Sequence, residues 1–151
     1  MPQKRVYYIP ENSSPLQEKF INCIMKKGKK NLARKIFSDT LTAIGKKESK
    51  NPQEIFQKAI ENVKPNIEIR PKRIGGAVYQ IPVEVPPRRQ ISLAIRWIVQ
   101  TAKHTHGRSM ALKLAGELLA AYTEQGSAFK KKEELHRMAQ ANKAFAHLAK
   151  F

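Results

Sequence analysis

The sequence predicts a mainly α-helical fold, in which six helices form a single domain and one two-stranded β-hairpin protrudes between helices three and four. Apolar residues recur at helical spacing in six segments, and helix start or stop residues flank these segments. One stretch in the middle instead alternates around a glycine pair. The chain has 151 residues, of which 41% are hydrophobic, enough for one domain with its own core. We expect residues 1–14 to form an irregular basic tail and residues 67–85 to form a β-arm.

The first helix is predicted from the residues at its start. Two prolines and no helical periodicity mark residues 1–14 as a tail. Ser14 can cap a helix, Pro15 suits its first position, and Gln17 completes a capping box. Gly28 is expected to end the helix, because glycine readily adopts the left-handed conformation that follows a helix. The apolar stripe in between consists of Leu16, Phe20, Ile21, Ile24 and Met25.

The second and third helices follow after short connections. The second is expected to stop at Gly45, and the third to start at a cap formed by Asn51 and to stop at Pro65. Pro52 again suits the first helical position. Their apolar stripes are Leu32, Ile36, Thr40, Leu41 and Ile44, and then Ile55, Phe56, Ala59, Ile60 and Val63.

Three more helices are predicted after the arm. The fourth is expected to end at Gly107 and the fifth at Gly126, whereas the sixth runs almost to the C-terminus. Trp97 shares the apolar stripe of the fourth helix and is expected in the core. The three stripes are Leu93, Ala94, Trp97, Ile98 and Ala102; Met110, Leu112, Ala115, Leu118, Leu119 and Tyr122; and Leu135, Met138, Phe145 and Leu148.

The β-arm is predicted to turn at residues 75–76, because both glycines can adopt the positive φ of a tight primed turn. Pairing about this turn places Tyr79 opposite Lys72 and Ile81 opposite Arg70. Two strands alone are marginally stable in water, and each strand here contains a proline that cannot donate a ladder hydrogen bond. The aliphatic, aromatic and cationic side chains of the arm suit structured RNA. The alternative is that the ribbon packs on the helices as a small wing.

Positive charge is the most unusual property of the composition. Lys and Arg number 29 against 12 acidic residues, so the formal net charge is +17. Such a field repels itself unless a polyanion neutralises it, which favours nucleic acid over a membrane surface as the partner. A solvated face would account for any single run of charge, but five runs at element ends favour one shared polyanion. The runs lie at residues 26–35, 70–73, 88–89, 103–108 and 130–132.

Motifs for catalysis, cofactors or metals are not convincing in this sequence. Residues 28–30 lack the other residues of a phosphate-binding P-loop. His104 and His106 lie in a basic loop without clustered acids, so no metal site is expected. Glu133 and His136 have the ordinary i,i+3 spacing of an exposed helix face. We therefore expect no enzymatic activity, no cofactor and no membrane span, since no apolar run reaches about 18 residues.

Several sequence blocks occur in one order along the chain. A Gly-Lys-Lys core at residues 28–30 has apolar pairs at set distances on both sides, at residues 20–21 and 36–37, and a small residue at Thr40. The later blocks read ENVKPNIEI, KRIGGAVYQIPVEV, LAIRWIV, SMALKLAGEL and KKKEELHRMAQANKAFAH. Over residues 16–147 the chain resembles the bacterial-type (bacterial and organellar) small-subunit ribosomal protein seven family.

This resemblance implies a six-helix fold with a protruding β-arm between helices three and four. It also implies a structural protein of the small ribosomal subunit that binds the head (3′ major) domain of ribosomal RNA and organises head assembly. The arm would lie near the exit-site tRNA and the mRNA path in translation, held by RNA and a neighbouring ribosomal protein. The expected location is the ribosome of a bacterial cytoplasm or of an organelle, a plastid or a mitochondrion, and no targeting peptide is visible.

The residues expected to contact RNA are mostly the cations of the basic runs. Lys and Arg would neutralise phosphates, and Tyr79 could stack on a base. The full set is Lys4, Arg5, Lys26, Lys27, Lys29, Lys30, Arg34, Lys35, Arg70, Lys72, Arg73, Tyr79, Arg88, Arg89, Lys103, Arg108, Lys113, Lys130, Lys131, Lys132 and Arg137.

Two other classes of protein remain as alternatives. A DNA-architectural protein is the main rival, since net charge does not separate DNA from RNA, but residues 75–76 offer no wedge side chain at the arm tip. A membrane-surface protein would need one helix with a strong split between a basic and an apolar face. Here each helix has a core-like stripe, and the charges concentrate at the joints between helices.

Overall fold

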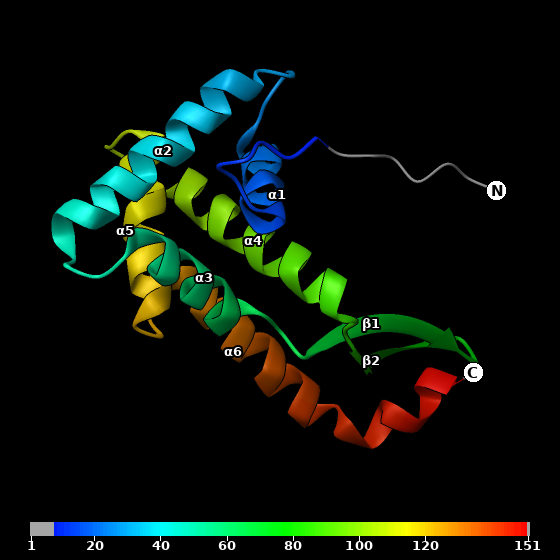
Figure 1. Cartoon of the computed structure of the whole chain (residues 1–151). Coiled ribbons are helices and arrows are strands. Elements are labelled where there is room, and N and C mark those ends of the chain that lie inside the picture. Colours follow the sequence, from blue (N-terminus) through cyan, green and yellow to red (C-terminus); the bar gives the residue numbers. More distant parts are fainter. Residues whose placement is uncertain (1–7, 151) are drawn as a thin grey trace.

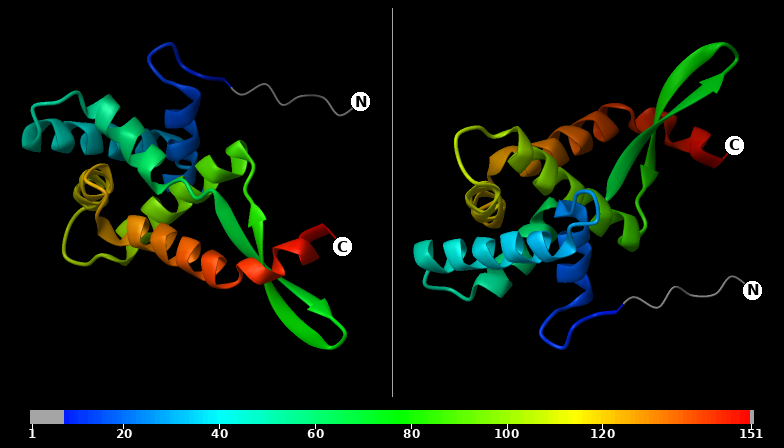
Figure 2. Two further views of the ribbon diagram at one scale, coloured as in Figure 1. Left: turned by 90° about the horizontal axis from the view of Figure 1, so that it is seen from below. Right: turned by 90° about the horizontal axis from the view of Figure 1, so that it is seen from above.

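The computed structural model describes residues 8–150 and shows a helical body from which a two-stranded ribbon projects (Figures 1 and 2). The hairpin lies between the third and fourth helices, as predicted. In chain order the elements are α1 (Pro15–Ile24), α2 (Lys30–Lys47), α3 (Pro52–Val63), β1 (Ile67–Ile74), β2 (Ala77–Glu84), α4 (Pro87–His104), α5 (Met110–Tyr122), α6 (Gly126–Ala141) and the 3-10 segment η1 (Lys143–Lys150).

The predicted starts of α1 and α3 are confirmed by their capping hydrogen bonds. Ser14 Oγ accepts the N–H of Gln17 at 3.2 Å, and Asn51 Oδ1 accepts the N–H of Gln53 at 3.0 Å. A proline follows each cap at the first helical position. Each cap satisfies one of the amides that have no partner inside a helix, and such a cap stabilises a helix by about 1 kcal/mol.

The predicted ends of the first two helices are wrong. α1 stops at Ile24, before Gly28, because the chain leaves the helix at Met25 and reverses through a turn in which Lys27 and Gly28 have φ of 53° and 72°. α2 continues through Gly45 to Lys47. A Cβ atom on Gly45 would lie 3.2 Å from Cγ of Pro52, so this glycine allows the start of α3 to approach α2 closely.

Gly126 also has a role other than the predicted one. It does not end the fifth helix but is the first residue of α6, with φ of 88°, and Glu124 takes the left-handed conformation after α5. A Cβ atom on Gly126 would lie 2.9 Å from the Cβ atom of Ala120. Glu117 Oε1 accepts the N–H of Ala128 at 2.8 Å, so a carboxylate of α5 caps the start of α6.

The sixth helix does not run almost to the C-terminus, contrary to the prediction. α6 ends at Ala141, and the amide side chain of Asn142 donates to the carbonyl of Met138 at 2.9 Å. The chain then continues as η1, which lies beside the ribbon in Figures 1 and 2 and packs on β2. The apolar residues predicted for one long helix are therefore divided between α6 and a segment that contacts the arm.

The core of the body lies among α1, α2, α3, α4 and α5. The rings of Phe20, Phe37 and Phe56 meet with centroid distances of 5.1–5.7 Å, and all three side chains are buried. Burying a side chain of this kind contributes about 1.5–3 kcal/mol. Trp97 is half-buried and packs against this core, which agrees with its predicted place. Leu32 is 53% exposed, although the predicted stripe included it.

The register of the ribbon agrees with the prediction: Tyr79 pairs with Lys72 and Ile81 pairs with Arg70. The two ends of the ribbon differ in burial. Glu68 near the base and Ile81 midway along β2 are both buried, whereas Val78 near the tip is 62% exposed. The base therefore packs on the body and the tip projects from it. Of the two predicted alternatives, the packed wing describes the base of the ribbon and the protruding arm describes its tip.

Candidate nucleic-acid interface

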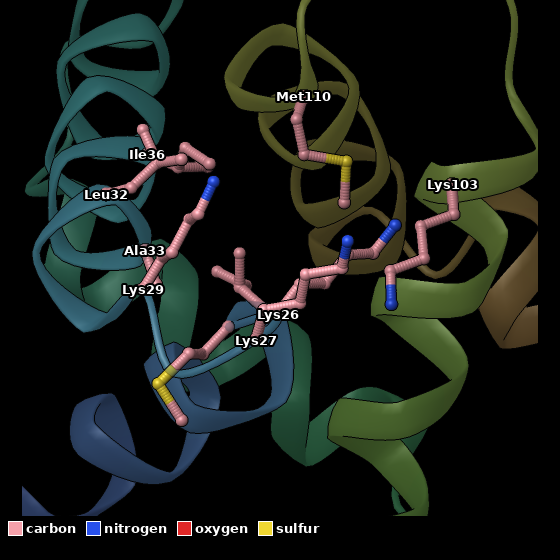
Figure 3. Close-up of a pocket in the computed structure, with 10 residues that line it drawn as sticks. Lys26, Lys27, Lys29, Leu32, Ala33, Ile36, Lys103 and Met110 are labelled. Carbon is pink, nitrogen blue, oxygen red and sulfur yellow. The ribbon is translucent and has the colours of Figure 1, made fainter.

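A groove of about 410 Å³ lies where the α1–α2 connection meets the end of α4 and the start of α5 (Figure 3). Lysine side chains surround it. In Figure 3 the ammonium groups of Lys26, Lys27 and Lys103 gather on one side, while Lys29 extends along Ile36 and Leu32 on the other. The apolar lining consists of Ile24, Met25, Leu32, Ala33, Ile36 and Met110.

The groove exists because the first and fourth basic runs meet in space. The turn at residues 27–28 reverses the chain between α1 and α2 and exposes the lysines on either side of it. Lys103 stands in the last turn of α4. No acidic residue lines the groove. Four like charges around an apolar floor repel one another, and a polyanion that binds there relieves this repulsion.

Three helix starts beside basic runs lack a cap from the side chain of the preceding residue. The residues before α2, α4 and α5 are Lys29, Pro86 and Ser109, and none of them caps its helix through its side chain. By contrast, α1 and α3 are capped by the side chains of Ser14 and Asn51. The first-turn amides of an uncapped helix carry partial positive charge and can donate to a phosphate.

A second group of cations lies at the base of the ribbon and is organised by a carboxylate. Glu68 is buried, and its Oε1 accepts Nε of Arg70 at 2.8 Å while its Oε2 accepts Nε of Arg89 at 2.8 Å. Burial alone would raise the pKa of Glu68, but the hydrogen bonds from Arg89 and Arg70 outweigh burial and lower that pKa. Glu68 thereby joins β1 to the first turn of α4.

A similar carboxylate holds two cations of the first basic run. Glu18 contacts Nζ of Lys30 at 3.1 Å and Nη2 of Arg34 at 3.2 Å, and it also accepts the hydroxyl of Ser13 at 3.0 Å. Burial opposes ionisation of Glu18, yet these partners lower its pKa overall. Lys30 and Arg34 are therefore paired with a carboxylate of their own chain, unlike the lysines around the groove.

The C-terminal segment contacts the middle of the ribbon. Nζ of Lys72 donates to the carbonyl of Leu148 at 3.1 Å, and the ring of Tyr79 lies 5.3 Å from the ring of Phe145. Tyr79 is consequently half-buried by a residue of its own chain. Arg73, nearer the tip, is exposed.

The cations of α6 face two environments. Nζ of Lys132 donates to the carbonyl of Asn62 at 2.7 Å and lies over the ring of Phe129, so it is turned toward the body. His136 Nε2 accepts the N–H of Asn66 at 3.2 Å. Burial and then the charge of Lys132 lower the pKa of His136, which favours the neutral ring that this bond requires. The exposed predicted residues of this helix are Lys130, Lys131 and Arg137.

The remaining predicted residues are placed as follows. Lys35, Arg88 and Arg108 are exposed, and Lys113 is half-buried. Lys4 and Arg5 lie outside the described residues. The fold brings together residues 26–29 with Lys103, and Arg70 with Arg89, whereas the cations of α6 belong to neither group.

Several residues of this surface were not anticipated from the sequence. Glu18, Glu68 and Phe145 determine which predicted residues are free, and Met110 forms part of the groove floor. Only Glu68 had a usable signal, because positions i and i+2 of a strand share one face and Arg70 is two residues away.

Residues 8–150 show neither a metal-ligand group nor a membrane-spanning helix. No three or more His, Cys, Asp or Glu side chains in this range are grouped so as to hold a metal ion. Its helices also include none with the length and apolar character needed to cross a bilayer.

Comparisons with known proteins identify the family. The family model described as ribosomal protein S7p/S5e matches residues 1–143. The chain is 54% identical to small ribosomal subunit protein uS7 of Rhodopirellula baltica, over 93% of this chain and 90% of that protein. It is 48% identical to uS7 of Maridesulfovibrio salexigens, over 97% of this chain and 94% of that protein. Each match spans nearly the whole length of both this chain and its relative, so the chain belongs to the ribosomal protein S7p/S5e family.

Proposed function

We propose that the protein is a structural constituent of the small ribosomal subunit, with no enzymatic activity and acting as a single domain. It binds the head (3′ major) domain of small-subunit ribosomal RNA and organises head assembly. The observation that carries this proposal is the groove rimmed by Lys26, Lys27, Lys29 and Lys103 without an acidic residue among its lining. An RNA backbone crossing the α1–α2 and α4–α5 connections would place its phosphates against these lysines.

The groove floor adds a contact that charge alone does not provide. Met110, Ile36 and Leu32 present apolar surface between the lysines, and Leu32 is exposed although it is aliphatic. An unpaired RNA segment can cover such surface with the face of a base while its phosphates reach the lysines. The uncapped start of α2 supports the same placement, because it lies beside Lys29.

The ribbon has a separate role in this proposal: its tip lies near the exit-site tRNA and the mRNA path. Projection from the body, exposed Arg73 and exposed Val78 support this role, because they leave the tip available to partners. Neighbouring ribosomal proteins are further partners. The location is the ribosome of a bacterial cytoplasm or of an organelle, and the uS7 relatives named above are bacterial proteins.

Binding to the transcribed head-domain RNA, measured across a salt series, tests the proposal. In the variant Lys26→Ala/Lys29→Ala, affinity should fall roughly tenfold, and the slope of log affinity against log salt should decrease by about 0.7–0.9 for each lost phosphate contact. Lys30 is left intact because it contacts Glu18 at 3.1 Å.

Lys46→Ala/Lys47→Ala is the matched control, since it removes two exposed lysines from the far end of α2. Its affinity should stay close to wild type. Equal losses in both double variants would remove the groove from the interface. Tighter binding to duplex DNA of the same length, or failure of the protein to co-sediment with small subunits, would contradict the proposed function.

A further inference from the structure

Glu68, Arg70 and Arg89 form a buried carboxylate with two guanidinium groups from different elements. The Glu68 side chain is 9% exposed, while those of Arg70 and Arg89 are 58% and 47% exposed. Arg70 adds a second contact, from Nη2 to Glu68 Oε1 at 2.6 Å. The carboxylate therefore sits inside, and both cations reach outward from it into solvent.

Most hydrogen-bond donors of the two arginines remain available. A guanidinium group has five N–H donors in a planar fork. Glu68 occupies Nε and one side of Nη2 on Arg70 but only Nε on Arg89. Within residues 8–150 no other acceptor contacts these guanidinium groups, so their outer edges can donate to a ligand.

The local charge is positive despite the carboxylate. Two guanidinium groups and one carboxylate leave one unit of positive charge, and the pKa of Glu68 is lowered, so Glu68 stays ionised at neutral pH. The other acidic residue of the ribbon, Glu84, pairs with Ile67, one position along the strand from the Glu68–Val83 pair, and so lies on the opposite face.

We propose that Glu68 is a positioning residue that assembles Arg70 and Arg89 into one phosphodiester-binding site, where the ribbon leaves the body. This inference rests on the proposed RNA-binding function. Each guanidinium is fixed by a charge-assisted hydrogen bond before RNA arrives, so less side-chain entropy is lost on binding. A phosphate bound by both arginines also connects β1 to α4 and fixes the direction of the arm.

A purely neutralising role for Glu68 predicts the opposite sign. If the carboxylate only cancels positive charge, its removal should strengthen binding to a polyanion. If it orders two arginines, its removal should weaken binding although the net charge rises. The sign of the change therefore separates the two roles.

The test compares Glu68→Gln with Glu84→Gln in the full chain, using the transcribed head-domain RNA as the probe. Glutamine keeps the volume of Glu68 but offers one acceptor, so it can hold only one guanidinium. We expect Glu68→Gln to weaken binding roughly five- to tenfold and to lower the salt slope by about one phosphate contact. Glu84→Gln, which removes the same charge from the exposed face, should leave affinity equal or slightly higher.

A second pair of variants tests the same inference even if Glu68→Gln fails to fold. Arg89→Lys keeps the charge but loses the planar fork, so its affinity should fall several-fold with an unchanged thermal midpoint. Arg96→Lys changes an exposed arginine further along α4 that is not among the predicted RNA contacts, and it should bind like wild type. Binding by Glu68→Gln as tight as by Glu84→Gln, or by Arg89→Lys as tight as by Arg96→Lys, would overturn this inference and leave the proposed function standing. Failure of the wild type to bind the RNA would instead remove the proposed function.

Discussion

The helical body and the β-ribbon are stabilised in different ways. The body has an apolar core in which Phe56 meets Phe20 and Phe37 edge to face. Between residues 67 and 84 the ribbon has one deeply buried apolar side chain, Ile81. Its other supports are the polar contacts of Glu68, the packing of α6 against the strands, and the C-terminal segment η1.

This difference means that the two regions should open independently. Apolar burial stabilises the body without help from a partner. The ribbon depends on a few polar contacts and on segments distant in the chain; Lys72 and Leu148, for example, are 76 residues apart. Segments with few buried apolar contacts open at lower free energy than the core, so the ribbon can adjust to a partner while the body stays folded.

The largest effect is expected from truncating an aromatic ring in the body. Phe56→Ala should lower the free energy of unfolding by about 3–5 kcal/mol, because the site is fully packed and cannot collapse. Phe145→Ala is the matched change in the support of the ribbon and should cost about 1 kcal/mol or less. Chemical denaturation followed by circular dichroism measures both. Equal losses would show that η1 belongs to the same cooperative unit as the core.

Removal of the ribbon tip should affect function more than folding. A chain lacking residues 73–79, with the gap closed by a short turn, should keep its helical body and its incorporation into small subunits. Its thermal midpoint should change by a few degrees at most, and the defect should appear in exit-site tRNA retention. Purified subunits carrying the deletion allow all three to be measured. Loss of helical structure would show that the ribbon folds as part of the body, and normal tRNA retention would contradict the role of the tip.

A smaller effect is expected when η1 is removed. A chain ending at Asn142 loses the contacts of Phe145 with Tyr79 and of Leu148 with Lys72. Ribbon amides should then exchange with solvent roughly tenfold faster, while amides of α3 and α5 keep their protection. Hydrogen exchange by mass spectrometry resolves the two regions. Unchanged exchange in the ribbon would mean that η1 does not support it.

The smallest effect concerns pH at the base of the ribbon. The pKa of His136 is lower in the folded chain than its usual 6.5, first through burial and then through Lys132. The neutral ring accepts the N–H of Asn66, so this contribution to stability is complete above pH 6.5 and is lost as pH falls through the folded pKa. NMR titration should show the Asn66 amide changing with the His136 ring. His136→Gln should remove that titration, whereas an amide that titrates independently of the ring would contradict the link.

The sequence contained enough local information for the starts of α1 and α3 and for the register of the ribbon. Ser14 and Asn51 cap through atoms two or three residues away, and the turn at residues 75–76 determines which residues pair. The ends of α1 and α2 were mispredicted because glycine allows the left-handed conformation that ends a helix but does not require it. Gly45 stays helical, since close packing against Pro52 outweighs its low helix propensity.

The sequence did not show which cations are paired inside the protein and which are free to contact a partner. Lys29 and Lys30 are neighbours, yet only Lys30 reaches Glu18, because the turn before α2 points the two side chains in different directions. Likewise, Tyr79 is covered by Phe145 from a segment that was predicted to continue a helix. Contacts between residues far apart in the chain determine which cations and rings are free to bind a partner. A basic run in the sequence shows only where the cations lie along the chain.

Native-state hydrogen exchange of the full chain, with and without head-domain RNA, tests the independence of body and ribbon most directly. Without RNA, the amides of residues 67–84 should exchange through openings that cost about 2 kcal/mol less than those of α3 and α5. With RNA, protection should rise most at the base of the ribbon, around Glu68 and Arg70. A single opening free energy shared by ribbon and core, unchanged in pattern when RNA binds, would contradict the proposed separation.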